Sequence, residues 1–147
     1  GNNIMATRGL YKFYDNVETF NNKQPTAVIY RHWDNYLESG GMDLLDFLVW
    51  LRDSNFDNRF TDSSYLSSKF VVYLGREFAT SWIDEPLDFL GVGIMPNNKD
   101  CWEEYIYHIV SEVDNSGLPK VYVDSYEYDE EYLLTALAKE NLIQVKQ

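Results

Sequence analysis

Apolar and polar residues alternate over two early stretches of the chain, and a period of two residues is typical of β-strands. The first stretch is Met5–Asp15, which places aromatic residues on one face, and the second is Thr26–Trp33, whose Val28 and Ile29 favour a pleated surface. The polar segment Asp15–Pro25 between them predicts a loop or a wide hairpin turn. We therefore expect the two strands to be antiparallel neighbours in one sheet.

The pattern then changes to the period of an α-helix. Gly40–Gly41 permits a turn between strand and helix, and across Met42–Ser54 the apolar residues follow helical spacing. A second helix is predicted to begin near Thr61 or Asp62, either of which can cap it. Its apolar residues recur every four positions to about Ser81, so each helix has one face to bury.

Three shorter stretches return to strand-like patterns, at Phe89–Met95, Trp102–Val110 and Lys120–Tyr126. The first is apolar and interrupted by glycine, which indicates a buried strand closely approached by another element. Asp114–Pro119 has the composition of a turn, so the other two stretches are predicted to form a hairpin. A final helix is predicted over residues 129–140, where three acidic residues precede a leucine-rich segment.

The predicted order of elements is therefore ββαα-βββ-α. Consecutive strands without intervening helices are typical of the α+β class, with an antiparallel sheet of about five strands and helices packed on one face. Residues 5–147 are expected to form a single domain, because no repeat, linker or low-complexity run divides them. Residues 1–4, which precede Met5, are expected to be an artificial remnant.

Negative charge gathers in the C-terminal half of the chain. The formal net charge is −12, and residues 100–131 hold ten acidic residues against one lysine, which accounts for nine of those charges. Such a field repels nucleic acid, whose binding depends on basic side chains meeting phosphates. We expect it either to keep the protein soluble or to bind a basic host protein, with mimicry of DNA phosphates as a further alternative. The candidate partner-binding residues are Glu104, Asp124, Glu127 and Glu131.

The cysteine and hydropathy content indicates a protein of the cytoplasm. Cys101 is the only cysteine, so no intramolecular disulfide forms, and its acidic neighbours disfavour a reactive thiolate. The sequence has no apolar run long enough for a membrane span and no basic-then-apolar signal peptide. We therefore expect a cytoplasmic protein without a membrane partner, and a homo-oligomer stays open.

The densest group of chemically versatile residues lies in the segment Thr26–Gly41. An arginine beside aromatic rings can pair with a phosphate while a ring stacks on a base, so this group could bind a small, nucleotide-like ligand. The candidate ligand-binding residues are Arg8, Tyr30, His32, Trp33, Asp34 and Tyr36.

Catalysis is the weaker interpretation of the same segment. His32 and Asp34 share a face if both lie in a strand, so a hydrolase that uses the pair is an alternative. The sequence has no phosphate-binding glycine motif, and none of its histidine, cysteine and acidic residues have the spacing of a metal site. We predict no cofactor, no metal and no catalytic residues.

Two short motifs carry a resemblance to a known group of proteins. The opening Met5–Gly9 and the later Ile29–Tyr36 resemble a group of uncharacterised small proteins of bacteriophages and prophages, which open with Met-x-Thr-Arg-Ser and then carry Tyr-x-x-x-Asp-Gly-Tyr. The segment E-Y-I-Y-H-I, a glycine turn and K-V-Y-V are similar to the C-terminal hairpin of that group. This chain departs from the motifs at Gly9, where the group has Ser, and at Asn35, where it has Gly.

The resemblance implies a phage-like origin and no particular mechanism. Together with the absence of catalytic motifs, it leads to the hypothesis of a small acidic protein, acting in a bacterial host cytoplasm by binding a host protein or a ligand. Counter-defence is one such role.

Overall fold

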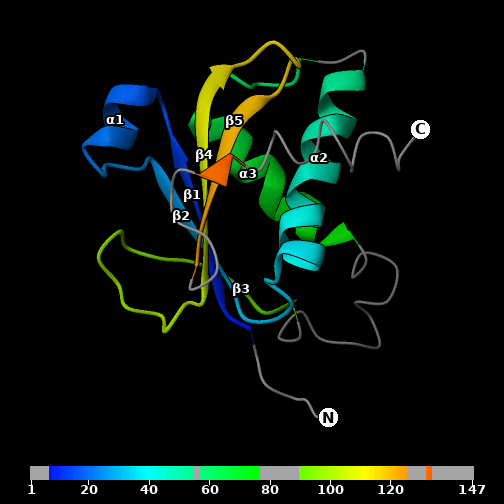
Figure 1. The fold of residues 1–147 in the computed structure, drawn as a ribbon. Helices are drawn as coiled ribbons and strands as arrows, with labels where there is room; N and C mark the ends of the chain where they lie inside the picture. The colour runs from blue at the N-terminus through cyan, green and yellow to red at the C-terminus, as the bar shows by residue number, and fades with distance from the viewer. Residues whose placement is uncertain (1–6, 55–56, 77–89, 126–131, 134–147) are drawn as a thin grey trace.

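The computed structural model describes residues 7–54, 57–76, 90–125 and 132–133. Within these residues, six strands form one sheet in the order β3-β2-β1-β4-β5-β6 (Figure 1). The strands are β1 (Gly9–Tyr14), β2 (Ala27–Arg31), β3 (Val92–Ile94), β4 (Tyr105–Val113), β5 (Pro119–Ser125) and β6 (Tyr132–Leu133). The helices are α1 (Val17–Asn21), the π-helical turn η1 (Leu37–Gly41), α2 (Met42–Asp53) and α3 (Ser63–Leu74).

The α+β class is confirmed, but the sheet is mixed rather than purely antiparallel. β1 and β2 are antiparallel neighbours as predicted, with Gly9 opposite Arg31, and the β4–β5 hairpin also forms. The error lies in the middle of the sheet, where β1 and β4 run parallel, with Gly9 opposite Tyr105. β3 returns on the outer edge of β2, so the chain must cross the sheet before β4 can pair with β1.

The segment between β1 and β2 was predicted to be a loop and instead contains the short helix α1. Asn16 caps this helix, because its side chain accepts a hydrogen bond from the Thr19 backbone N–H while the Thr19 hydroxyl lies 3.2 Å from the Asn16 nitrogen. This reciprocal arrangement is a capping box, here built from Asn and Thr. It stabilises a helix that has no apolar periodicity of its own.

The later helices and strands agree with the predicted types and differ in extent. α2 begins at Met42 and α3 is capped by Asp62, both as predicted. α3 ends at Leu74, and the rest of the stretch predicted to reach Ser81 lies largely outside the described residues. β3 is a short edge strand and not a buried one, since Ile94 is exposed.

The predicted C-terminal helix is wrong at the two residues that the structure describes there. Tyr132 and Leu133 pair with Val123 and Tyr122 as strand β6. A free edge of β5 offers backbone hydrogen bonds to these residues, which local helical propensity does not outweigh. The other residues of that predicted helix lie outside the described part of the chain.

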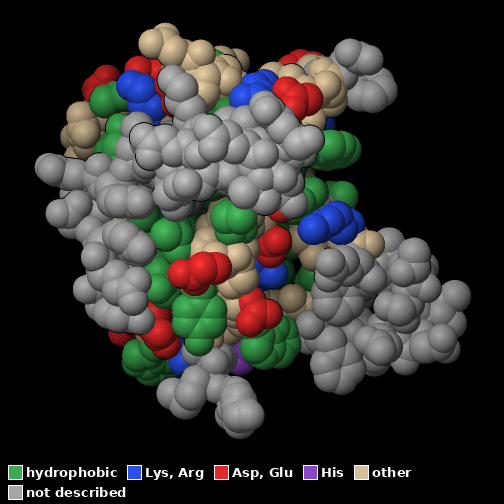
Figure 2. Space-filling view, turned by 45° about the vertical axis from the view of Figure 1, so that its right-hand side comes forward, with side chains coloured by type: hydrophobic (Ala, Val, Ile, Leu, Met, Phe, Trp, Pro, Cys, Tyr) green, Lys and Arg blue, Asp and Glu red, His purple; other side chains and the backbone are tan. Residues whose placement is uncertain are grey.

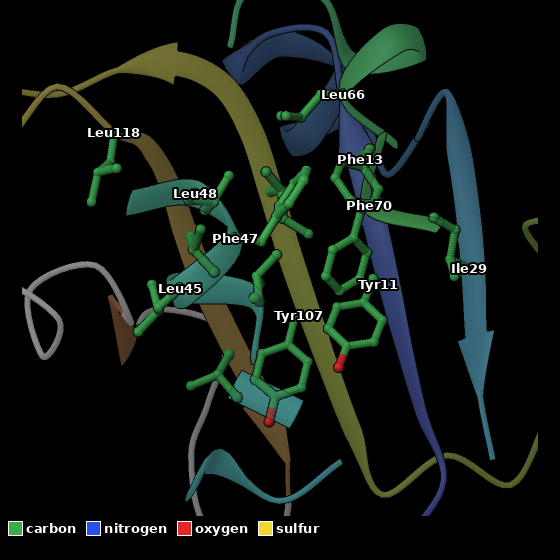
Figure 3. Packing of buried hydrophobic residues seen from close by; sticks show 14 of the residues in the cluster. Tyr11, Phe13, Ile29, Leu45, Phe47, Leu48, Leu66, Phe70, Tyr107 and Leu118 are labelled. Carbon is green, nitrogen blue, oxygen red and sulfur yellow. The ribbon is translucent and has the colours of Figure 1, made fainter. Parts of the chain in front are cut away.

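The main core lies between one face of the sheet and helices α2 and α3 (Figures 1 and 3). Alternate residues of β1 and β4 point into it, and Figure 3 shows Tyr11 and Tyr107 side by side, with centroids 5.2 Å apart. Leucines and phenylalanines from both helices complete the core, and each fully buried side chain of this size contributes roughly 1.5–3 kcal/mol.

The opposite face of the sheet is covered differently, which corrects the expectation that all helices pack on one face. α1 lies on this side, where Phe20 stacks on Tyr122 with centroids 5.1 Å apart. A second, smaller apolar cluster contains Leu10, Val28 and Cys101. Tyr30, near the end of β2, is partly buried and packs against this cluster.

Candidate functional site

The predicted ligand-binding residues gather where β2 ends and β1 begins. The Tyr30 hydroxyl lies 2.6 Å from His32 Nδ1, and the His32 backbone N–H donates to the Gly91 carbonyl at 2.8 Å. Burial raises the pKa of Tyr30, and the nearby Arg8 guanidinium opposes that shift. The structure therefore brings Arg8, Tyr30 and His32 together, as the pairing of the two strands requires.

Exposed aromatic side chains surround this end of the sheet. Trp33 and Tyr36 are 40% and 42% exposed, and Trp102, which the sequence did not single out, is 75% exposed. The backbone N–H of Glu104 donates to the Arg8 carbonyl at 2.9 Å, which holds the segment that precedes β4 against β1. These rings can stack on a planar ligand or pack against a protein surface.

The ring of Trp33 lies directly over Gly91. Gly91 has a φ of 63°, and a Cβ atom built there would lie 2.1 Å from Trp33 Cζ3. Only glycine fits this position, both for its backbone conformation and for its lack of a side chain. The glycine-interrupted stretch before β3 thus does receive the close approach that its sequence predicts.

Asp34 does not form the pairs that would make it catalytic or charge-compensated. β2 ends at Arg31, and Asp34 has a φ of 58°, so His32 and Asp34 do not share a strand face as predicted. Among the described residues, Arg8 and Asp34 form no ion pair. The Asp34 carbonyl instead accepts a hydrogen bond from the Ser39 hydroxyl at 2.6 Å.

Asn35 holds the whole segment in place. Its side chain is fully buried, and its amide nitrogen lies 2.9 Å from the Thr7 carbonyl, 2.7 Å from that of Arg31 and 3.1 Å from that of Trp33. The Tyr107 hydroxyl donates to the Asn35 carbonyl at 2.6 Å. This role escaped the sequence analysis, in which Asn35 stood only as a departure from a motif.

Tyr11, Arg31 and Asp43 continue this internal network toward the core. The Tyr11 hydroxyl donates to the Gly40 carbonyl at 3.0 Å, and Arg31 pairs with Asp43 at 2.9 Å. Burial raises the pKa of Tyr11 to about 12 and raises that of Tyr107 further. Both phenols therefore stay protonated as hydrogen-bond donors, and their hydrogen bonds to Gly40 and Asn35 stabilise the conformation of the segment.

The predicted partner-binding residues are only partly described. Glu104 and Asp124 line a hollow of about 350 Å³ together with Glu103, Ile106 and Ser125. Glu127 and Glu131 lie outside the described residues. Figure 2 shows acidic side chains on several separate parts of the described surface, and Lys120 compensates Glu112 at 3.1 Å.

A larger concavity lies between the outward sides of α2 and α3, and we call it the interhelical groove. Its volume is about 1090 Å³. The apolar residues that line it are Phe47, Val49, Trp50, Leu51, Val72 and Tyr73. Trp50 is 62% exposed and Val72 is 74% exposed. The sequence contained a signal for this groove, since both residues are apolar yet fall outside the buried stripes of their helices.

Charged residues stand on opposite sides of the groove. Asp46 belongs to α2 and Asp57 follows it, whereas Lys69 belongs to α3 and Arg76 follows that helix. Asp57 pairs with Arg59 at 3.2 Å. The Arg76 guanidinium lies 3.7 Å from the centroid of the Tyr73 ring, which fixes it at the rim.

Two further findings concern metals and membranes. In the described ranges, no group of three or more histidine, cysteine or acidic side chains is placed to hold a metal ion. The same part of the chain contains no helix with the length and apolar character needed to cross a bilayer.

No protein-family model, no curated protein and no solved structure matches this chain. Its function must therefore be argued from its own residues.

Proposed function

We propose that this protein acts by binding another protein, and that the interhelical groove receives apolar side chains of that partner. The observation that supports this most directly is the exposure of Trp50 and Val72 along a groove of about 1090 Å³. Large apolar concavities are the usual location of binding sites, and exposed tryptophans are frequent binding hot spots. In water alone, such a surface is unfavourable.

The biological setting of this binding function follows from the sequence motifs. Their resemblance to small phage and prophage proteins supports a role in the cytoplasm of a bacterial host. A phage protein that occupies a host protein in counter-defence requires a binding surface and no catalytic centre. An exposed apolar groove meets that requirement.

A second candidate function is the binding of a basic protein or a small ligand at the end of the sheet. The hollow beside Glu104 and Asp124 favours a lysine or arginine side chain, and the exposed Trp102 lies close by in sequence. Arg8 and Trp33 favour an anionic ligand with a planar group instead. Both versions use residues that do not line the interhelical groove.

The two locations are distinguished by a matched pair of tryptophan variants. The tagged chain, Trp50→Ala and Trp102→Ala are used to capture proteins from a bacterial lysate. The proposal predicts a protein that is captured by the chain and by Trp102→Ala but lost with Trp50→Ala. The reverse pattern, together with loss in Glu104→Lys/Asp124→Lys at low salt, would assign binding to the sheet end and overturn the use of the groove.

A further inference from the structure

We infer that the occupant of the interhelical groove is an amphipathic α-helix whose apolar stripe is bordered, on the side facing α3, by two acidic residues about two turns apart. This inference rests on the proposed function and specifies the chemistry of the partner. It follows from what the walls of the groove can and cannot offer.

The walls favour a helix over an extended segment. The backbone groups of α2 and α3 are already used in their own helical hydrogen bonds, so the groove offers side chains and few free backbone partners. An extended peptide would desolvate its own N–H and C=O groups there without replacement bonds. A helix satisfies its backbone internally and presents a single apolar stripe, which matches the apolar lining around Trp50 and Val72.

The charges on the α3 side define the border of that stripe. Lys69 lies in α3, and Arg76 lies seven positions later, just beyond the end of that helix; both line the groove. Seven residues of α-helix span about two turns, or roughly 10 Å, which sets the approximate spacing of the two charges. α3 itself contains no acidic residue, and among the described residues neither base takes part in an ion pair. The interhelical groove of a chain with a net charge of −12 thus has a basic edge.

The opposite side of the groove has the opposite sign. Asp46 and Asp57 disfavour acidic residues of the partner on the α2 side, although the nearby Arg59 offsets Asp57. A helix that packs along the groove with its acidic edge toward Lys69 and Arg76 satisfies both sides. If the same helix ran along the groove in the opposite direction, its acidic edge would face Asp46 and Asp57 instead. The charges therefore also set the direction of the bound helix.

Three synthetic peptides test this inference directly. Each has about 18 residues, or five helical turns, and the same leucine stripe, and they differ only in carrying Glu, Gln or Lys at two border positions seven apart. Binding to the full chain is measured by fluorescence anisotropy at low and high salt. We expect the Glu peptide to bind on the order of tenfold more tightly than the Lys peptide at low salt, with a smaller difference at high salt.

Variants of the chain separate charge recognition from apolar contact. Lys69→Glu/Arg76→Glu should reverse the order of the three peptides, and Trp50→Ala should weaken all three by more than about tenfold, as loss of a hot spot does. Ile94→Ala, which removes an exposed apolar side chain from the edge strand β3, should change none of them.

Equal affinities for the three peptides, or an order that survives the charge reversal, would overturn the acidic border. Failure of every peptide to bind would overturn the helical occupant, whereas the lysate experiment with Trp50→Ala would still judge the proposed function separately. If removal of residues 134–147 allowed all three peptides to bind where the full chain did not, the groove would belong to the chain's own C-terminal residues, and the partner helix would be rejected.

Discussion

The segment from Arg31 to Gly41 and the interhelical groove differ in how their side chains are used. In the segment, Asn35 is fully buried and binds three carbonyl groups, and Arg31 pairs with Asp43. In the groove, Trp50 and Val72 are mostly exposed. The segment is prominent in the sequence because it is rich in polar and aromatic residues. The sequence signal for the groove is weaker, because it consists only of Trp50 and Val72 being apolar outside the buried stripes of their helices.

The difference shows that a dense group of polar and aromatic residues in a sequence does not by itself indicate a ligand-binding site, because their polar groups can be used in hydrogen bonds within the protein. A chain that leaves a strand, turns through a π-helical turn and enters a helix must satisfy several backbone groups that have no regular partners. Polar side chains nearby are the natural source of those bonds. An apolar residue that faces water has no such structural use, so its exposure is the more informative observation.

The largest effect that we expect concerns Gly9 and Asn35, the two positions that depart from the phage-type motifs. A Cβ atom at Gly9 would lie 2.5 Å from Asn35 Cγ, so the two side chains compete for one space. Asn35→Gly should lower the free energy of unfolding by about 4 kcal/mol, because buried carbonyl groups lose their donor. Gly9→Ser should lower it by about 1–3 kcal/mol through overpacking.

The double variant makes this comparison decisive. In the Asn35→Gly background, a serine side chain at position 9 no longer meets the side chain of residue 35. Gly9→Ser should therefore lower the free energy of unfolding by at least about 1 kcal/mol less in this background than in the original chain. Urea denaturation of the four proteins measures this coupling. Strictly additive losses would show that the two positions do not exclude each other.

The next largest effect concerns His108, a polar residue that is buried on the other face of the sheet and used within the protein. This side chain is buried beneath Phe20, and its Nδ1 lies 2.8 Å from the Tyr14 hydroxyl. Burial, with Lys12 and Lys23 nearby, lowers its pKa from 6.5 to about 4. Because the unfolded chain binds this proton more tightly, the contribution to stability is present above pH 6.5 and is lost as the pH falls toward 4.

The expected loss is about 3 kcal/mol over that range, since each unit of pKa difference corresponds to about 1.4 kcal/mol. Chemical denaturation at several pH values, compared between the chain and His108→Gln, isolates this contribution from that of the carboxylates. His32→Gln is the control. An NMR titration that placed His108 near its ordinary pKa would contradict the burial argument.

Much of the fold could be predicted because strand alternation and helical spacing record burial directly. The antiparallel pairing of β1 with β2 followed from a short polar connection, and the start of α3 followed from Asp62 as a cap. The parallel pairing of β1 with β4 could not be predicted, because it depends on β3 lying at the far edge of β2. The position of β3 depends on packing across the whole sheet, so it has no signature in the local sequence pattern.

The candidate site was less accessible to sequence reasoning. The antiparallel pairing of β1 with β2 places Arg8 near Tyr30, but the sequence could not show that β2 ends before His32 or that Asp34 has a positive φ. The groove lies between the outward sides of α2 and α3, so its exposed residues follow from tertiary geometry. Trp50 was visible only as an apolar residue off the buried stripe of its helix.

A smaller effect is expected at Tyr107, which links the core to the segment. Its buried hydroxyl donates to the Asn35 carbonyl at 2.6 Å, and Tyr107→Phe removes that bond while keeping the ring. The free energy of unfolding should fall by about 1–2 kcal/mol. Tyr65→Phe, at a tyrosine that is 53% exposed, should change it by less than about 0.5 kcal/mol, and equal losses in the two variants would remove the distinction.

The smallest effect on stability is expected in the groove itself. Trp50→Ala and Val72→Ala remove side chains that are already mostly in contact with water, and alanine is the better helix former. Each should change the free energy of unfolding by less than about 0.5 kcal/mol, whereas Phe47→Ala, one helical turn from Trp50 but buried, should lower it by about 3–5 kcal/mol. Thermal melts and urea denaturation measure all three. If Trp50→Ala lowered the free energy of unfolding by more than about 2 kcal/mol, the isolated chain would already cover this side chain. The contrast between a segment whose polar groups bond within the protein and a groove that is open to solvent would then no longer hold.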